Sequence, residues 1–153
     1  MQVPHNAFVV VADGRKMLFL RNEGDATHPN LQVERKRVQD NPATSEQATD
    51  LSGRAQSTRM EGGTFASGGG TMENADFHQI EEDRFAADTA DLINRRALNN
   101  DFESLIVIAP PRTLGELRKH YHKEVENRLA GEIDKDLTRH TIPEIEKALI
   151  AAE

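Results

Sequence analysis

The most constraining feature of this sequence is the apolar run LIVIA at residues 105–109. The run is short, uninterrupted and rich in β-branched residues, which is typical of a strand buried on both faces. Pro110 and Pro111 end the run, because proline has no N–H to donate to a β-ladder. Thr113 and Glu116 follow with the spacing of a capping box, which predicts a helix start. A buried strand that leads into a helix is the core of an α/β unit.

The segment after the prolines carries one apolar stripe with helical spacing. Its members are Leu114, Leu117, Tyr121, Val125 and Leu129, and they predict one continuous helix that Gly131 ends. Beyond it, Ile133, Lys135 and Leu137 alternate with Asp134 and Asp136, which favours a short last strand, with a continued helix as the alternative. A final helix is expected over residues 141–152, because Thr141 and Glu144 again have capping-box spacing.

The first forty residues predict a β-meander. Residues 7–12 and 17–20 are apolar and suit two strands, and Asp13-Gly14 between them predicts a type I′ hairpin turn. Residues 22–30 predict a loop, and residues 31–38 alternate as an exposed third strand with solvated charges. An exposed strand of this kind would permit edge pairing into a dimer.

A different composition begins at residue 40. Residues 40–76 are rich in Ser, Thr, Gly, Asn and Gln, and six of the ten glycines lie between Gly53 and Gly70. No helix or strand period fits this stretch, so it predicts a long mobile loop inserted between the third strand and the first helix. We expect that helix to begin at Asp76, with Asn74 or Asp76 as its cap.

The first helix has one buried face in the sequence pattern, formed by Phe85, Thr89, Leu92, Ile93 and Ala97. The order of elements is then β-β-β-α-β-α-(β)-α. Three antiparallel strands followed by crossover units predict an α/β fold of the α+β type, with a mixed sheet and helices packed on it. This is the layout of ribonuclease-H-like folds.

The bulk properties limit the class of protein. A chain of 153 residues predicts one domain, 1–153. The chain has no cysteine, which excludes disulfides and thiolate sites, and no signal segment or membrane span is visible, so we expect a cytoplasmic protein without membrane contact. The net charge of −7 argues against broad electrostatic binding of nucleic acid but permits a local basic patch.

Three segments carry a family resemblance. They are HNAFVVVADGRKMLFL, EEDRFAADTADLINRRALNNDFESL, and IVIAPPRTLGELRKHYHKEV followed by GEIDKDLT. Together they resemble the bacterial proteins required for attachment to host cells, a family related to the central domain of archaeo-eukaryotic peptide-chain release factors. The resemblance implies that central-domain fold, with β-β-β-α-β-α-β order, and by analogy a ribosome or RNA partner.

In release factors, the loop between the third strand and the first helix carries Gly-Gly-Gln, which enters the peptidyl transferase centre. The matching stretch here holds Gly62-Gly63-Thr64 and Gly68-Gly69-Gly70-Thr71. Neither is Gly-Gly-Gln, and the nearest glutamines are Gln56 and Gln79. The resemblance therefore carries no catalytic glutamine over to this chain.

Three groups of residues are candidates for binding. The glycine-rich loop could dock on RNA through Arg54, Arg59, Gln79 and the backbone amides of Gly62, Gly63, Gly68, Gly69 and Gly70, or could be a plain linker. Arg112, just past the central strand, could grip a phosphate or carboxylate, or could pair with Asp101 or Asp134. A basic patch of Arg15, Lys16, Arg35, Lys36 and Arg37 is possible across the first hairpin and third strand, with an ordinary solvated strand face as the alternative.

A two-metal nuclease site could in principle form from the carboxylates Asp13, Glu82, Asp83, Asp134 and Asp136. The turn explains Asp13 better, and favourable charge at a helix start explains Glu82 and Asp83. The histidines have no metal-ligand spacing, and no Ser-His-Asp, Walker or dinucleotide motif is present. We therefore expect no catalytic residue, metal or cofactor. The resemblance implies a non-enzymatic binding protein for ribosome or RNA. The alternatives are a hydrolase of peptidyl-tRNA or RNA, and a protein-interaction factor in attachment.

Overall fold

The structure is a computed structural model. It describes residues 1–39 and 67–152, with side chains for residues 1–39 and 77–152. The chain divides into two compact units, Met1–Val38 with Asp83–Glu153, and Gln39–Glu82. The single domain inferred from chain length stays a prediction.

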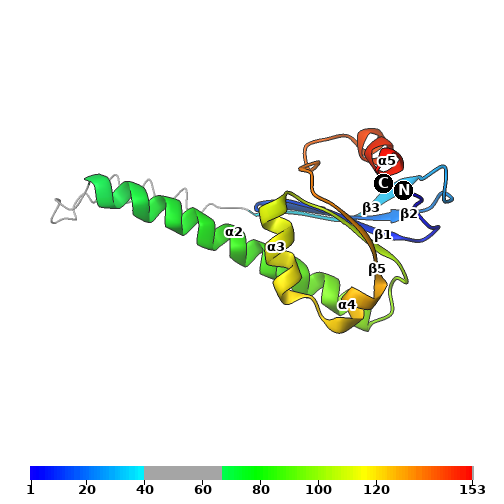
Figure 1. The fold of residues 1–153 in the computed structure, drawn as a ribbon, viewed down its shortest axis with the longest axis horizontal. Helices are drawn as coiled ribbons and strands as arrows, with labels where there is room; N and C mark the ends of the chain where they lie inside the picture. The colour runs from blue at the N-terminus through cyan, green and yellow to red at the C-terminus, as the bar shows by residue number, and fades with distance from the viewer. Residues whose placement is uncertain (40–66, 153) are drawn as a thin grey trace. The chain divides into compact units, whose positions relative to one another are not determined.

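The described chain forms five strands and four helices (Figure 1). The order is β1 (Phe8–Ala12), β2 (Lys16–Asn22), β3 (Leu31–Val38), α2 (Ser67–Leu98), β4 (Leu105–Ile108), α3 (Pro111–His120), α4 (Lys123–Arg128), β5 (Leu129–Ile133) and α5 (Ile142–Ala151). The predicted strands at 7–12, 17–20, 31–38 and 105–109 are confirmed. The mixed α/β class is confirmed, and the ribonuclease-H-like assignment stays a prediction.

The sheet has the order β3-β2-β1-β4-β5. Strand β1 pairs antiparallel with β2, which pairs antiparallel with β3, whereas β4 pairs parallel with both β1 and β5. The register of β2 and β3 shifts between Phe19 and Leu20, where Glu34 is left as an extra residue in β3. This irregularity is a β-bulge, and it lies in the edge strand.

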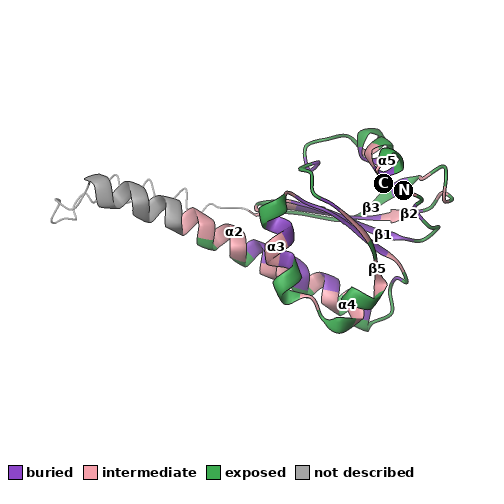
Figure 2. Cartoon of the chain, in the orientation of Figure 1, coloured by how far each residue is buried: buried purple, intermediate pink, exposed green. Residues whose placement is uncertain are grey.

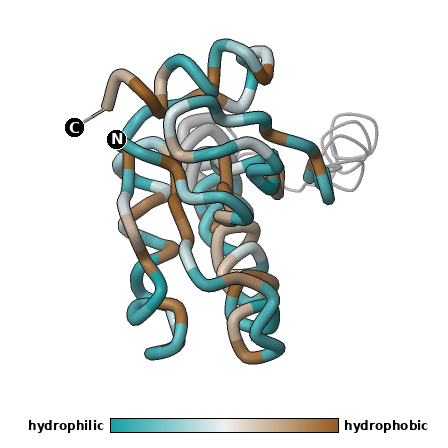
Figure 3. The backbone as a smooth tube through the Cα atoms, turned by 90° about the vertical axis from the view of Figure 1, so that its right-hand side faces the viewer, coloured by the Kyte–Doolittle hydropathy of each residue, from teal (hydrophilic) through white to brown (hydrophobic). Residues whose placement is uncertain are grey.

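Helices cover both faces of the sheet. Helices α3 and α4 lie on one face and α5 on the other (Figure 1). One core joins alternate strand residues such as Phe8 and Phe19 to Phe85 and Ile93 of α2 and to Leu117 of α3. The purple buried segments of Figure 2 run along the strands, and Figure 3 shows apolar and polar stretches alternating along the chain. The central strands are therefore buried on both faces, as the run at 105–109 predicts.

The opposite core is smaller. It joins Val9 and Val11 of β1 and Ile106 of β4 to Ile145 and Leu149 of α5. Because successive strand residues point to opposite faces, β1 supplies Phe8 and Val10 to one core and Val9 and Val11 to the other. No described helix is long and apolar enough to cross a membrane.

Helix α2 begins earlier than predicted. It starts at Ser67 rather than Asp76, so Gly68, Gly69 and Gly70 are helical. The end of the predicted loop at 67–76 is therefore wrong, and its remainder, 40–66, lies outside the described residues. Adding residues to a formed helix costs far less than starting one, so a helix nucleated by its buried C-terminal part can extend through poor helix formers.

The predicted continuous helix over 113–130 is wrong. Helix α3 begins at Pro111 with Pro110 as N-cap and no side-chain cap, so the capping box of Thr113 is wrong too. The helix stops at His120, and the amide of Asn94 replaces helical hydrogen bonds there. Its Nδ2 donates to the carbonyl of His120 (2.8 Å), and its Oδ1 accepts from the N–H of His122 (2.8 Å). The apolar stripe is therefore divided between α3, α4 and the start of β5.

The last strand and the first turn also differ from prediction. Strand β5 spans Leu129–Ile133, not 133–137, and it contains Gly131, where an added Cβ would lie 2.9 Å from the Met1 side chain. The type I′ turn at Asp13 is wrong, since only Asn6 and Asn100 among the described non-glycine residues have positive φ. Helix α5 begins at a capping box of Thr141 and Glu144, as predicted.

Candidate functional site

The carboxyl ends of the parallel strands β1, β4 and β5 meet at one edge of the sheet. Open α/β sheets place their ligand sites at this edge. The turn after β1 holds Asp13, the segment after β4 holds Arg112, and the segment after β5 leads to Thr138. Lys16 pairs with Val38, so the end of β3 lies here as well.

Thr138 joins the segments at this end of the sheet through hydrogen bonds. Its side chain is buried, and its hydroxyl oxygen lies 2.8 Å from Asp13 Oδ2 and 2.9 Å from Asp136 Oδ1. Asp13 Oδ1 accepts from the N–H groups of Arg15 and Lys16, both at 2.7 Å. The Lys16 ammonium donates to the Thr138 carbonyl at 2.8 Å. The network joins the β1–β2 turn to a segment about 125 positions later.

The carboxylates considered for a two-metal nuclease site do not form a metal-binding cluster. Among the described residues, no group of three or more His, Asp or Glu side chains could hold a metal ion. Asp13 and Asp136 share the hydroxyl of Thr138 instead, which gives both a structural role. The sequence reading of Asp13 as a turn residue is confirmed, although the turn is of another type.

Arg112 is exposed in the first turn of α3. It makes no hydrogen bond or ion pair with any described residue, so neither Asp101 nor Asp134 is its partner. The N-cap of α3 is Pro110, which offers no side-chain acceptor to the helix N–H groups. An uncapped helix start carries partial positive charge, which adds to the guanidinium beside it.

The five residues of the predicted basic patch lie on different faces. Arg35 and Arg37 pair with Phe19 and Met17, whose side chains enter the core under α2, whereas Lys36 pairs with Leu18 on the α5 face. Arg37 lies 3.8 Å from the carboxylate of Asp88 and 5.5 Å from the Phe85 ring centroid. Strand alternation therefore divides the run ERKR between two faces.

Basic residues still outnumber acidic ones at the carboxyl end of the sheet. We call the following set the basic edge: Arg15, Lys16, Lys36, Arg37, Arg112, Lys135 and Arg139. The same segments hold three acidic residues, Asp13, Asp134 and Asp136. All of the basic edge except Lys16 is exposed, so this end of the sheet carries an excess of exposed positive side chains on a chain of net charge −7.

The candidates in the glycine-rich stretch are only partly described. Arg54, Arg59, Gly62 and Gly63 lie outside the described residues. Gly68, Gly69 and Gly70 form the first turn of α2. Gln79 lies farther along α2, is partly buried and has an interaction partner, so it is not a free contact.

A pocket of about 590 Å³ opens at the opposite end of the sheet, and we call it the amino-end pocket. It is formed by the segments before β1 and before β4, together with the end of β2 and part of β3. Both residues with positive φ, Asn6 and Asn100, line it. Asparagine tolerates this conformation better than most residues.

Arg21 closes one wall of the amino-end pocket. Its Nη1 donates to the carbonyls of Asn6 (3.1 Å) and Asp101 (2.8 Å), and its Nε to Glu34 Oε2 (3.1 Å). Arg96 Nη1 donates to the other oxygen of Glu34 at 2.6 Å. Burial raises the pKa of Glu34, but the hydrogen bonds from Arg21 and Arg96 outweigh it, so the pKa is lowered. Both guanidinium groups stack over Phe8.

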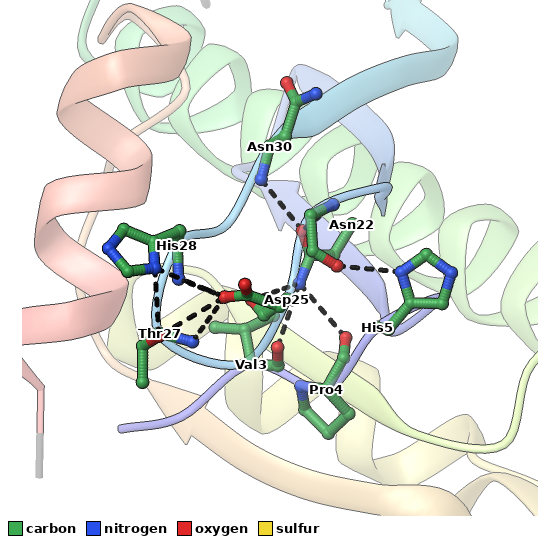
Figure 4. Close-up of polar contacts among 9 residues, drawn as sticks. Val3, Pro4, His5, Asn22, Asp25, Thr27, His28 and Asn30 are labelled. Carbon is green, nitrogen blue, oxygen red and sulfur yellow. Dashed lines mark hydrogen bonds and ion pairs between the residues drawn. The ribbon is translucent and has the colours of Figure 1, made fainter.

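Asn22 fixes the neighbouring loop, as Figure 4 shows. It is fully buried, and its Nδ2 donates to the carbonyls of Val3 (2.9 Å), Pro4 (3.1 Å) and Asp25 (3.3 Å). Its Oδ1 accepts from the N–H groups of Gly24 and Asn30, both at 2.9 Å. One amide thus joins the N-terminal segment to both ends of the β2–β3 connection.

Sequence reasoning missed Asn22, Arg21, Glu34 and Thr138. Each acts through partners on other segments, and for Thr138 the separation reaches 125 positions. The available signal was weak: Asn22 is a polar residue directly after an apolar strand, where a loop start explains it equally well.

One protein-family model matches the chain. It is described as bacterial archaeo-eukaryotic release factor family 12, and it covers residues 6–149. No curated protein matched the chain. The matched region includes both ends of the sheet and all described strands. The chain therefore belongs to bacterial archaeo-eukaryotic release factor family 12.

Proposed function

We propose that this protein is a non-enzymatic binding module that contacts the ribosome or an RNA through the basic edge. Its membership of a family related to release factors supports a partner in translation. The observation that carries the proposal is Arg112, an exposed guanidinium that is unpaired among the described residues and lies at the uncapped start of α3. A contact with the ribosome would place the protein in the cytoplasm.

The chemistry of the basic edge suits phosphate. A guanidinium can bind two phosphate oxygens at once, and helix N-terminal N–H groups also donate hydrogen bonds to phosphate oxygens. Lys36, Arg112 and Arg139 are exposed and make no hydrogen bond or ion pair with described residues. They can meet phosphates without breaking contacts of the fold. The predicted contacts in the stretch 40–66 stay part of the proposal.

Ribosome co-sedimentation tests this function. The full chain is expected to migrate with ribosomal particles at low salt and to dissociate as salt rises. The variant Lys36→Glu/Arg112→Glu/Arg139→Glu is expected to bind about tenfold more weakly or worse. The slope of its log K against log salt concentration is expected to be shallower by about two to three, because each lost phosphate contact releases nearly one counterion fewer.

A matched control carries the same charge change elsewhere. Arg95, Lys123 and Lys147 are exposed basic residues outside the basic edge, and replacing all three by Glu should weaken binding far less. Equal loss in both variants would mean that net charge, not this surface, governs binding. Residence of the unmodified chain at the top of the gradient in every salt would contradict the proposal.

The alternatives stay predictions. A hydrolase would release labelled peptide from peptidyl-tRNA, with or without magnesium, and we expect no release in either condition. A role in attachment to host cells through other proteins would appear as a pull-down dominated by protein rather than RNA.

A further inference from the structure

The amino-end pocket has the size of a ligand site. Its volume of about 590 Å³ lies inside the range of roughly 300 to 1,000 Å³ that is usual for small-molecule sites. It lies at the end of the sheet opposite the basic edge. A ligand there would therefore use different chemistry from the ribosome or RNA contact proposed above.

The charged side chains of the pocket are mainly acidic. Four carboxylates line it, Glu23, Glu34, Asp101 and Glu103, against the single guanidinium of Arg21. Glu34 is neutralised by Arg21 and Arg96. The other three carboxylates are exposed and make no hydrogen bond or ion pair with described residues. Their summed field attracts cations and repels anions.

Arg21 does not offer a site for an anion. Its Nη1 and Nε are committed to two backbone carbonyls and to Glu34, and its side chain is 14% exposed. An anionic ligand would thus meet three free carboxylates and no free guanidinium. The charge of the lining alone therefore favours cationic over anionic ligands.

His5 adds an acceptor to the same lining. Its Nδ1 lies 2.7 Å from the carbonyl oxygen of Gly24, and because a carbonyl can only accept, Nδ1 carries the proton. In the neutral ring, Nε2 is then an acceptor. A ligand with N–H donors matches this nitrogen as well as the carboxylates.

The walls are held before any ligand binds. Asn22 fixes the segment of Val3 and Pro4, and Arg128 Nη1 donates to Asn100 Oδ1 (2.9 Å) and to the carbonyl of Phe102 (2.5 Å). A preformed site spends little binding free energy on ordering itself.

We propose that the amino-end pocket binds an extended ligand with at least two primary ammonium groups, held by Glu23, Asp101 and Glu103 with His5 as a further acceptor. The volume exceeds what one ammonium group needs, and the three carboxylates are distributed over two segments, 23 and 101–103. The same chemistry occurs in free linear polyamines and in lysine side chains of a partner peptide.

Isothermal titration calorimetry on the full chain tests this site at low salt. The probes are spermidine and the tripeptide amide Lys-Gly-Lys, with a neutral linear diol as the control ligand. Both amines are expected to bind and the diol is not. Stronger binding of spermidine assigns the pocket to a free polyamine, and stronger binding of the tripeptide assigns it to a protein segment.

Two variants locate the binding. Asp101→Asn/Glu103→Gln is expected to weaken amine binding by about tenfold or more, since two attractive charges are lost. Asp91→Asn/Asp134→Asn makes the same change in net charge at exposed carboxylates outside the pocket and should change affinity less than about twofold. Circular dichroism checks that the unmodified chain and the two double variants are folded alike.

Two outcomes would overturn the proposal. The first is no binding of either amine to the unmodified chain. The second is equal weakening in the two double variants, which would mean that only net charge attracts the amines. Neither outcome bears on the basic edge, because its test uses different residues and a different partner.

Discussion

The two ends of the sheet are built alike but carry opposite charge. At each end one buried polar side chain joins distant segments, Thr138 at the carboxyl end and Asn22 at the amino end. The side chains left unpaired among the described residues differ: Arg112 at one end, and Asp101 and Glu103 at the other. The same kind of internal clamp therefore supports two ends with free charges of opposite sign.

The comparison also shows which charges are structural. Asp13 and Glu34 are acidic residues at the two ends, and both are held by several donors from the chain itself. A charged side chain with its hydrogen bonds filled maintains the fold, whereas an exposed one without partners is available to a ligand.

The largest expected loss of stability comes from a substitution at the amino end of the sheet. Asn22→Ala removes an amide that serves three carbonyls and two N–H groups, some of them buried. Unsatisfied buried groups cost about 1–3 kcal/mol each, so we expect a loss of about 3 kcal/mol in the free energy of unfolding. Urea unfolding measures it. The control Asn127→Ala, at an exposed position, should change stability by less than about 0.5 kcal/mol, and a similar loss there would contradict the clamp.

A smaller effect tests the carboxyl end. Thr138→Val keeps the shape but removes the hydroxyl between Asp13 and Asp136, and we expect a loss of about 2 kcal/mol in the free energy of unfolding. Thr113→Val is the matched control, because Thr113 is also buried, at 9% exposed, yet its hydroxyl makes no hydrogen bond with described residues. If both substitutions cost the same, the hydroxyl of Thr138 is not a clamp.

The smallest effect depends on pH. The pKa of Glu34 is lowered below its usual 4.5, so its stabilisation is complete above that value and is lost as pH falls through the lowered pKa. Glu34→Gln should therefore cost about 1 kcal/mol at pH 7, a modest amount because the pair is partly exposed. Unfolding curves of both chains at pH 7 and near pH 3 should converge at the acid end. A gap that is constant with pH would exclude the ionised carboxylate as its source.

Local patterns predicted most of the strands. Residues 7–12, 17–20, 31–38 and 105–109 carry their pairing signal in their own side chains, because β-branched and apolar residues mark buried strands. The capping box before α5 was also readable, since Thr141 and Glu144 bond each other. These features need only neighbours in sequence.

Features that depend on distant partners could not be predicted. The break after His120 is stabilised by Asn94, 26 positions earlier. Leu129 belongs to a helical stripe by spacing but lies in β5, opposite Leu105 of β4. For the site, the position of Arg112 followed from the strand before it, whereas the amino-end pocket forms only when segments near residues 5, 21 and 102 meet. Sequence spacing contains no information on such meetings.

The bulge at Glu34 affects how readily strand β3 can pair with another chain in a concentrated solution. Strand β3 is the outer strand of the sheet and has β2 as its only described neighbour, so its outer backbone groups could template another chain. The extra residue interrupts the ladder midway, and the charged run 34–37 leaves few adjacent residues for a continuous second ladder. Interrupted, charged edge strands are a common protection against growth of fibrous β-aggregates. Glu34, whose carboxylate binds two arginines, thus also makes β3 a poor template for another strand.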